Sequence, residues 1–382
     1  MEKIESINIG RIKWCCADMG ITVDELAHEI SLSQTALNFL IKGEDGLTFK
    51  QLRSIAEYFG RGVLFFLEQE AVNAESFHSP QFRTLANQKP EISTKLKAFI
   101  ERVEKQRDVY LSLREDLDTE SRPIFTPPNL DGLSVEQAAV AARQWLGLAE
   151  KNDFDSYRDA VETQGILVFR SNGYNGKWQI AKENPILGFA LYDQTCPVIV
   201  VKKQPWETQQ CFTLMHELGH VLLHKSSSID DMNDMHSAQG MEREANAFAG
   251  YLLVTNHLLN SIRDDERPND VAFFDVWLEQ QQKACGASVE VLLRRLMDAG
   301  RLEAREYNAY RTWRSQQIYP EGEGGNRAYR NREPKHVFGD VFVKTVFDAL
   351  YARNITLNKA SDYLDRLKIK DLRKLEQYYA DL

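Results

Sequence analysis

Two histidines with a glutamate between them, in the order His216-Glu217-Leu218-Gly219-His220, are the residues of this sequence best suited to chemistry. In an α-helix, residues four apart lie on one face, so both imidazoles can reach one metal ion. Glu217 then lies beside the metal, where a carboxylate can take a proton from a bound water. The spacing predicts the site of a zinc-dependent peptidase, with His216 and His220 as ligands and Glu217 as general base.

Apolar residues on both sides predict that this motif lies in a buried helix. The runs 211–215 and 221–223 flank it, and both are almost entirely apolar. A buried helix holds two ligands rigidly. The metzincin type of zinc peptidase is excluded, because it requires glycine and histidine where this chain has Leu223 and Ser226. A third ligand must therefore come from another pattern.

A second helical pattern runs over residues 241–253, after a polar loop at 225–240. Glu242 in its first turn is the candidate third ligand. Asn246, one turn further, is the candidate hydrogen-bond partner of a ligating imidazole. Glu244 is the alternative ligand, because only the geometry of the helix chooses between the two glutamates. Two histidines and a glutamate, with water in the fourth position, form the open site of a catalytic metal.

The ligand set also indicates the metal and the mechanism. Zinc is expected with nitrogen and oxygen ligands, and manganese and iron are accepted by the same set. The metal would lower the pKa of its bound water, and Glu217 would take the proton and later return it to the leaving amine. His224 is interpreted as a histidine at a helix end, favourable to the helix dipole. His236 is interpreted as a surface residue, with oxyanion donor as the alternative.

The motif and its surroundings resemble the ImmA/IrrE family of bacterial metallopeptidases, in the form fused to an N-terminal XRE-type helix-turn-helix. The resemblance rests on H-E-L-G-H-x-x-L-H from His216 and on E-R-E-A-N-A-F-A-G-Y-L-L from Glu242. It extends upstream through the runs 188–192 and 197–201, so that it covers roughly residues 135–260. This is a local but specific match.

The resemblance implies that His216, His220 and Glu242 bind the metal and that Glu217 is the general base. It also implies the fold: mainly α with a small β-sheet (α+β), comprising an N-terminal five-helix bundle, a zincin-like domain of the gluzincin HExxH type and a helical C-terminal tail. The chain departs from the family pattern at Thr255, where a proline usually closes the second helix.

Length and composition predict two or three domains in a cytoplasmic protein. A chain of 382 residues with 43% hydrophobic content is too long for one compact core. Apolar runs of membrane-spanning length are lacking, and residues 1–5 lack the hydrophobic region of a signal peptide. The five cysteines are odd in number and scattered, which suits reduced thiols and no cysteine metal site.

Residues 1–72 are predicted to form the helix-turn-helix domain. Thr22 caps a short helix, and residues 34–41 form the helix after the turn. In an XRE-type domain the side chains facing the major groove of DNA would be Ser33, Gln34, Thr35 and Asn38. Residues 1–70, however, hold seven Lys or Arg against eleven Asp or Glu, whereas phosphate binding needs a basic face. A fold used for protein contacts or dimerisation is the open alternative.

The remaining domain limits follow from proline, glycine and helical patterns. A charged helix over residues 94–118 is interpreted as a packing or dimerising helix, which leaves a homo-oligomer open. Short strands are expected at 165–169, 186–192 and 197–202, and a strand at the rim could hold an extended substrate. The predicted units are 1–72 (helix-turn-helix), 73–133 (linker and long helix), 134–260 (zincin-like), 261–318 (helical extension) and 319–382 (basic linker and helical C-terminal domain).

Two classes of function remain as hypotheses. In the first, a zinc-dependent metallo-endopeptidase cleaves a cytoplasmic regulatory protein such as a repressor, and the helix-turn-helix brings it to DNA or to that protein. In the second, the chain is an XRE-type transcriptional regulator or an antitoxin-like partner of a toxin-like neighbouring gene product, with a weakly active or structural metal site. Intact Glu217 favours the first, and the long portions outside the peptidase region favour the second. Neither hypothesis involves a membrane.

Overall fold

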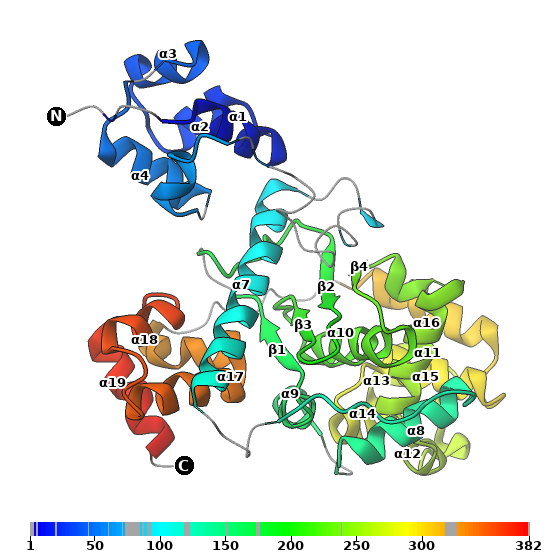
Figure 1. Cartoon of the computed structure of the whole chain (residues 1–382). Coiled ribbons are helices and arrows are strands. Elements are labelled where there is room, and N and C mark those ends of the chain that lie inside the picture. Colours follow the sequence, from blue (N-terminus) through cyan, green and yellow to red (C-terminus); the bar gives the residue numbers. More distant parts are fainter. Residues whose placement is uncertain are drawn as a thin grey trace. The chain divides into compact units, whose positions relative to one another are not determined.

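The computed structural model in Figure 1 divides into two compact units, Met1–Glu104 and Lys105–Leu382. It describes residues 4, 7–19, 21–44, 46–59, 61–70, 72, 85, 88–89, 93–117, 123–149, 152–172, 176–237, 239–317 and 327–380. Most of the linker predicted before residue 94, and the first part of the basic linker predicted from residue 319, lie outside these described residues.

The N-terminal unit contains the predicted pair of helices around a tight turn. Its described elements are α1 (Ile9–Asp18), α2 (Val23–Glu29), α3 (Gln34–Lys42), α4 (Phe49–Tyr58) and the 3-10 helix η1 (Val63–Phe66). Thr22 begins α2, because its side chain accepts a hydrogen bond from the Glu25 amide in a reciprocal capping box. Gly43 ends α3 at a φ of 74°, which costs a glycine little. Leu26, Leu40 and Leu52 are fully buried in the common core.

The long helix α7 (Thr94–Asp116) contains the boundary between the two units. Phe99, Val103, Tyr110 and Leu113 on this helix are buried within the chain. These apolar side chains of the predicted packing or dimerising helix are therefore covered by the chain itself.

The C-terminal unit holds a small sheet among helices. Its first part consists of α8 (Val135–Trp145), α9 (Phe154–Thr163), β1 (Leu167–Arg170), β2 (Ile186–Leu191), β3 (Val198–Val201), α10 (Glu207–Gly219), the π-helical turn η2 (His220–His224), β4 (Ser228–Asp231), η3 (Asp234–His236) and α11 (Gly240–Leu253). The predicted α+β fold is confirmed. The loop predicted at 225–240, however, contains strand β4, so that part of the prediction was wrong.

Helices and short 3-10 turns complete this unit. They are α12 (Asn256–Asn260), η4 (Asp264–Glu266), η5 (Val271–Phe273), α13 (Phe274–Trp277), α14 (Glu279–Cys285), α15 (Val289–Asp298), α16 (Ala304–Ser315), η6 (Arg327–Arg332), α17 (Glu333–Tyr351), α18 (Leu357–Tyr363) and α19 (Ile369–Ala380). In the part of the chain that the structure describes, no helix is both long and apolar enough to span a membrane.

The sheet has the strand order β1-β3-β2-β4, which places β4 at an edge. β1 is parallel to β3, while β2 is antiparallel to both β3 and β4. Ser228 pairs with Ala190 and Asp230 pairs with Gly188, with a register shift between Ile186 and Gly188. Because side chains alternate between the faces of a sheet, Ser228 and Asp230 share one face.

Helices cover both faces of the sheet (Figure 1). One face packs on α10 and α9 and forms the main core with Val168 and Ile199. On the other face, Phe169 makes edge-on contacts with Phe338 and Phe342 of α17. The face toward α10 is the one that carries Ser228 and Asp230, and it is there that the predicted site residues gather.

Candidate metal centre

The two histidines of the motif lie at the end of α10, in the interior of the C-terminal unit. Nearly every residue of α10 from Gln210 onward is buried, because α10 packs between the sheet and α11. The Nε2 atoms of His216 and His220 are 3.1 Å apart, and both side chains are at most 1% exposed. The helix therefore presents two imidazole nitrogens to one point, as its spacing predicts.

The helix widens into a single π-turn at His220, and this turn places a third histidine against the pair. His224 Nδ1 lies 3.0 Å from His220 Nδ1, and His224 Nε2 lies 3.2 Å from Glu244 Oε2. The chain then leaves the turn at Lys225 with a φ of 48°. His224 is thus more than the helix-end residue inferred from the sequence, because it links His220 to a carboxylate.

Of the two glutamates at the start of α11, the structure brings Glu242 to the histidines. Its Oε2 lies 3.3 Å from Nε2 of both His216 and His220. Glu244, two residues further, points to His224 instead. Residues two apart in a helix face different sides, so the two carboxylates cannot reach the same point.

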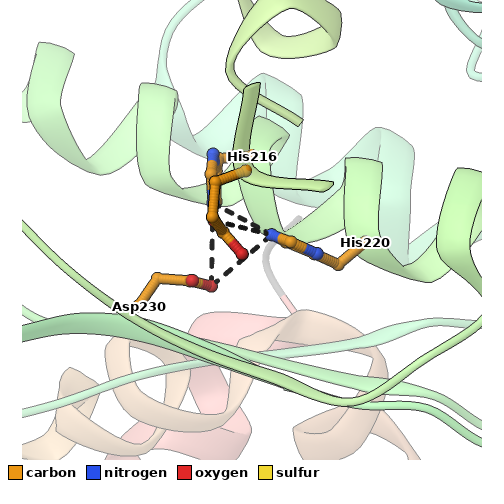
Figure 2. A group of neighbouring side chains, drawn as sticks. His216, His220 and Asp230 are labelled. Carbon is orange, nitrogen blue, oxygen red and sulfur yellow. Dashed lines mark hydrogen bonds and ion pairs between the residues drawn. The ribbon is translucent and has the colours of Figure 1, made fainter. Parts of the chain in front are cut away.

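Asp230 is a fourth group at this point, and no sequence pattern had indicated it. It is 2% exposed, and its Oδ2 lies 3.6 Å from His216 Nε2 and 3.8 Å from His220 Nε2. Figure 2 shows His216, His220 and Asp230 pointing toward one another. An alternating apolar pattern would have revealed the strand, but here the inward-facing positions are polar.

The four groups fit a divalent cation. One ligand atom from each of His216, His220, Asp230 and Glu242 lies within 4.8 Å of every other. In a tetrahedral site with bonds of about 2.0–2.1 Å, the donor atoms lie about 3.3 Å apart. Asp230 Oδ2 and Glu242 Oε2 are buried atoms without a hydrogen-bond partner. A cation would satisfy both oxygens, and the imidazole and carboxylate donors suit zinc and related metals.

The charges of the cluster also favour a cation at this place. Burial lowers the pKa of His216, but the carboxylates of Asp230 and Glu242 outweigh burial and raise it to about 9. Burial raises the pKa of Glu242, yet the imidazoles of His216 and His220, whose Nε2 atoms each lie 3.3 Å from its Oε2, hold that pKa well below its usual range. The two carboxylates thus favour a positive charge next to them, and a divalent cation would supply that charge directly.

Glu217 points from α10 toward the sheet. Its Oε2 accepts a hydrogen bond from Ser228 Oγ at 2.8 Å. A Cβ atom at Gly188 of β2 would lie 2.8 Å from Glu217 Oε1, so only glycine leaves room for this carboxylate. Burial, and after it the charge of Asp230, raises the pKa of Glu217 well above its usual value. A cation would offset that charge and favour the carboxylate form.

The contact predicted for Asn246 differs from the one observed. Its Nδ2 donates to the backbone carbonyls of Asp234 and Ser237, at 2.9 and 3.4 Å, rather than to an imidazole. Asn246 therefore stabilises the segment between β4 and α11 through these two hydrogen bonds. His236 lies in that segment, in η3.

The residues predicted to face DNA lie at the start of α3, and all four are exposed. Ser33 is the N-cap of this helix, with its side chain accepting from the Ala36 amide. Gln34 Nε2 lies 3.5 Å from Asn38 Oδ1. The structure thus groups Ser33, Gln34, Thr35 and Asn38 on one exposed surface, and their contact with DNA stays a prediction.

Two family models match the chain. Residues 161–297 match a peptidase family described as an IrrE N-terminal-like domain, and residues 12–66 match a helix-turn-helix family. The first match contains all four cluster residues and Glu217, and the second contains α2 and α3. A search of curated proteins gives no match. Residues 161–297 therefore carry an IrrE N-terminal-like peptidase domain, and residues 12–66 before it carry an XRE-type helix-turn-helix.

Proposed function

We propose that this protein is a metal-dependent endopeptidase, with zinc as its metal, that cleaves a regulatory protein in the cytoplasm. The observation that carries the proposal is the convergence of His216, His220, Asp230 and Glu242 beside Glu217 in a domain of a peptidase family. When bound, the metal supplies Lewis-acid chemistry, which activates water and polarises the peptide carbonyl.

Glu217 is the group that moves protons in this proposal. It takes a proton from the attacking water and gives it to the leaving amine. The hydrogen bond from Ser228 orients the Glu217 carboxylate. Because α10 and the sheet bury Glu217 completely, bulk water does not compete for its proton.

The substrate is proposed to bind as an extended chain along β4. This strand is at the edge of the sheet, and it carries Ser228 and Asp230 on the face toward α10. Main-chain hydrogen bonds to a strand edge recognise a peptide backbone without demanding one sequence. Sequence preference would then arise from the pockets and from the rest of the protein.

The N-terminal domain is proposed to bring the peptidase to its target, which is DNA or a DNA-bound repressor. The match to a helix-turn-helix family and the exposed start of α3 support this role. The excess of acidic residues in residues 1–70 favours a protein contact over unaided phosphate binding.

The test compares Glu217→Gln with Glu207→Gln, the same change in the first turn of the same helix. Glu207 Oε1 accepts from the Phe154 amide, and glutamine retains an acceptor there. Cleavage of purified repressors encoded beside the gene should fall about 100- to 10,000-fold in Glu217→Gln alone. Metal content, measured by mass spectrometry, should be equal in both variants. Undiminished cleavage by Glu217→Gln would overturn the assignment.

A second candidate function is a metal-containing regulator that binds its partner without cleaving it. Asp230 is the observation that favours it, because four protein ligands are typical of a structural metal site. A metal-loaded wild type that forms a stable complex with a neighbouring gene product, and cleaves none of the candidates, would decide for this function.

A further inference from the structure

We propose that Asp230 is a fourth protein ligand of the metal, so that the resting site is closed by side chains alone. This inference rests on the proposed metal centre and does not depend on hydrolysis. The sequence predicted three side chains and one water around the metal. In the present proposal the four ligands of the divalent cation are His216, His220, Glu242 and Asp230.

The distances around the cluster match a four-cornered site. The two Nε2 atoms are 3.1 Å apart, and each lies 3.3 Å from Glu242 Oε2. Asp230 Oδ2 lies 3.6 and 3.8 Å from the same nitrogens. The edges among the two nitrogens and Glu242 match the roughly 3.3 Å of a tetrahedral site. The edges to Asp230 are somewhat longer, and all four ligand atoms lie within 4.8 Å of one another. Asp230 is thus the fourth side chain in reach of the cation.

The buried side chain of Asp230 lies beside His216 and Glu217 of the same site. Its Oδ2 has no hydrogen-bond partner. The neighbouring Asp231 differs, because its Oδ1 accepts from the backbone amides of Asn233 and Asp234 and so shapes the turn after β4. A buried carboxylate oxygen without a partner is costly, and coordination to a cation removes that cost.

Burial favours the same ligand set. His216, His220 and Asp230 are each at most 2% exposed, and a carboxylate buried so deeply is stabilised by a cation beside it.

A closed site has a consequence for the peptidase. Water can reach the metal only when Asp230 leaves it. Asp230 is the second-last residue of a four-residue edge strand, which is held by β2 on one side through an irregular register. An extended chain that binds along β4 would therefore contact the strand that carries Asp230, and could move this ligand away from the metal.

The first test measures metal affinity in Asp230→Asn and Asp231→Asn. Both variants replace a carboxylate by an amide of the same shape on the same strand, and only the first faces the metal. Competition with a chromophoric chelator, using Zn²⁺ and Co²⁺, should show a loss of roughly 100-fold or more for Asp230→Asn, because removing a mere hydrogen-bond partner of a ligand already costs about 10- to 100-fold. Affinity equal to that of Asp231→Asn would overturn the inference.

The second test asks whether an exchangeable position exists on the metal. Azide is added to the Co²⁺-loaded proteins, and the visible absorption is followed. The spectra of wild type and Asp231→Asn should stay unchanged, while Asp230→Asn should respond as azide takes the vacated corner. An immediate response of the wild type, equal to that of Asp230→Asn, would show an open site and contradict the proposal.

Thermal unfolding with and without metal guards against a misfolded variant. Without metal, Asp230→Asn and Asp231→Asn should each unfold in one cooperative transition, which shows that both variants fold. Addition of metal should stabilise Asp230→Asn less than it stabilises wild type. If these results hold and no protein substrate is cleaved, the fourth ligand is supported and the proposed peptidase function fails. If Asp230→Asn keeps its metal affinity and wild type cleaves its substrate, the peptidase function is supported and the fourth ligand fails.

Discussion

Among the buried charges described in the C-terminal unit, two groups are satisfied in opposite ways. Arg158 and Glu162 of α9 form one, with Arg158 Nε 3.1 Å from Glu162 Oε1. The metal cluster around His216 and His220 is the other, and it leaves oxygens of Asp230 and Glu242 without hydrogen bonds. Arg158, Glu162, His216, His220 and Asp230 are all buried, so the difference lies mainly in the partners of the two groups.

Arg158 is satisfied by the backbone around it. Its guanidinium donates to the carbonyl of Val168 in β1 and to three carbonyls at the start of α17, those of Lys335, His336 and Val337. Glu162 accepts from the Val341 amide. Gly339 has a φ of 80°, and a Cβ there would collide with Glu162. This ion pair joins α17 to the sheet and leaves no place for a ligand.

The comparison teaches how a buried charge can be assigned a role. A charge whose hydrogen-bonding capacity is filled by the protein stabilises the fold, whereas converging oxygens without partners indicate something that the chain does not provide. Mutation of the Arg158 group should therefore lower the stability of the fold, and mutation of the His216 group should lower the affinity for metal.

The largest effect is expected from Arg158→Met. Glu162 and several carbonyls would lose their partner in the interior, which costs about 3–5 kcal/mol in the free energy of unfolding. Chemical denaturation measures it, with metal present and with chelator, and the loss should be the same in both. Arg294→Met, at an exposed pair with Asp298, is the control and should cost less than about 1 kcal/mol. Equal losses in the two variants would break the comparison.

A pH effect follows from Glu162. Burial raises its pKa to about 7 from 4.5, although the charge of Arg158 lowers it. Between these values the folded protein keeps a proton that the unfolded chain has lost, so stability falls as pH rises, by roughly 3 kcal/mol over the full shift. Glu162→Gln should gain stability relative to wild type over that range. Urea titrations between pH 4.5 and 8 test this.

The control for this experiment is Glu279→Gln, at an exposed pair with Lys283. Its difference from wild type should not follow the same pH dependence. The metal cluster is identical in wild type and both variants, so its own titration cancels from the differences. A pH-independent difference for Glu162→Gln would show that Glu162 stays ionised in the fold.

The smallest effect concerns the link from His220 through His224 to Glu244. Glu244→Gln and His224→Gln should weaken metal binding about 10- to 100-fold, because the chain of contacts orients the His220 ring. The fold should keep its stability without metal. Chelator competition measures the affinity, and His257→Gln, at an exposed position on α12, is the matched control. Unchanged metal affinity in both variants would show that His224 does not orient the His220 ring and acts only at the helix end.

The helices could be predicted from the sequence because their signals are local. α9, for example, begins after Asp153, which forms a capping box with Ser156 three residues later in the sequence. His216, Glu217 and His220 could be placed together because one helix fixes their spacing.

Asp230 could not be predicted, because its position depends on tertiary structure. β4 has only one apolar residue, Ile229, and its inward positions are polar, which reverses the usual pattern of a half-buried strand. The choice between Glu242 and Glu244 depends on how α11 packs on α10. The Arg158 group depends on chain segments far apart in sequence, which no local pattern reports.

All four cluster residues come from one stretch of chain, residues 216–242. Closing so short a loop around a cation costs little chain entropy. The strands that β4 needs also precede it in the sequence. Since chains are made from the N-terminus, we expect the metal centre to be complete before α17 leaves the ribosome. Metal capture would then be an early step in folding, and docking of α17 through Arg158 a late one.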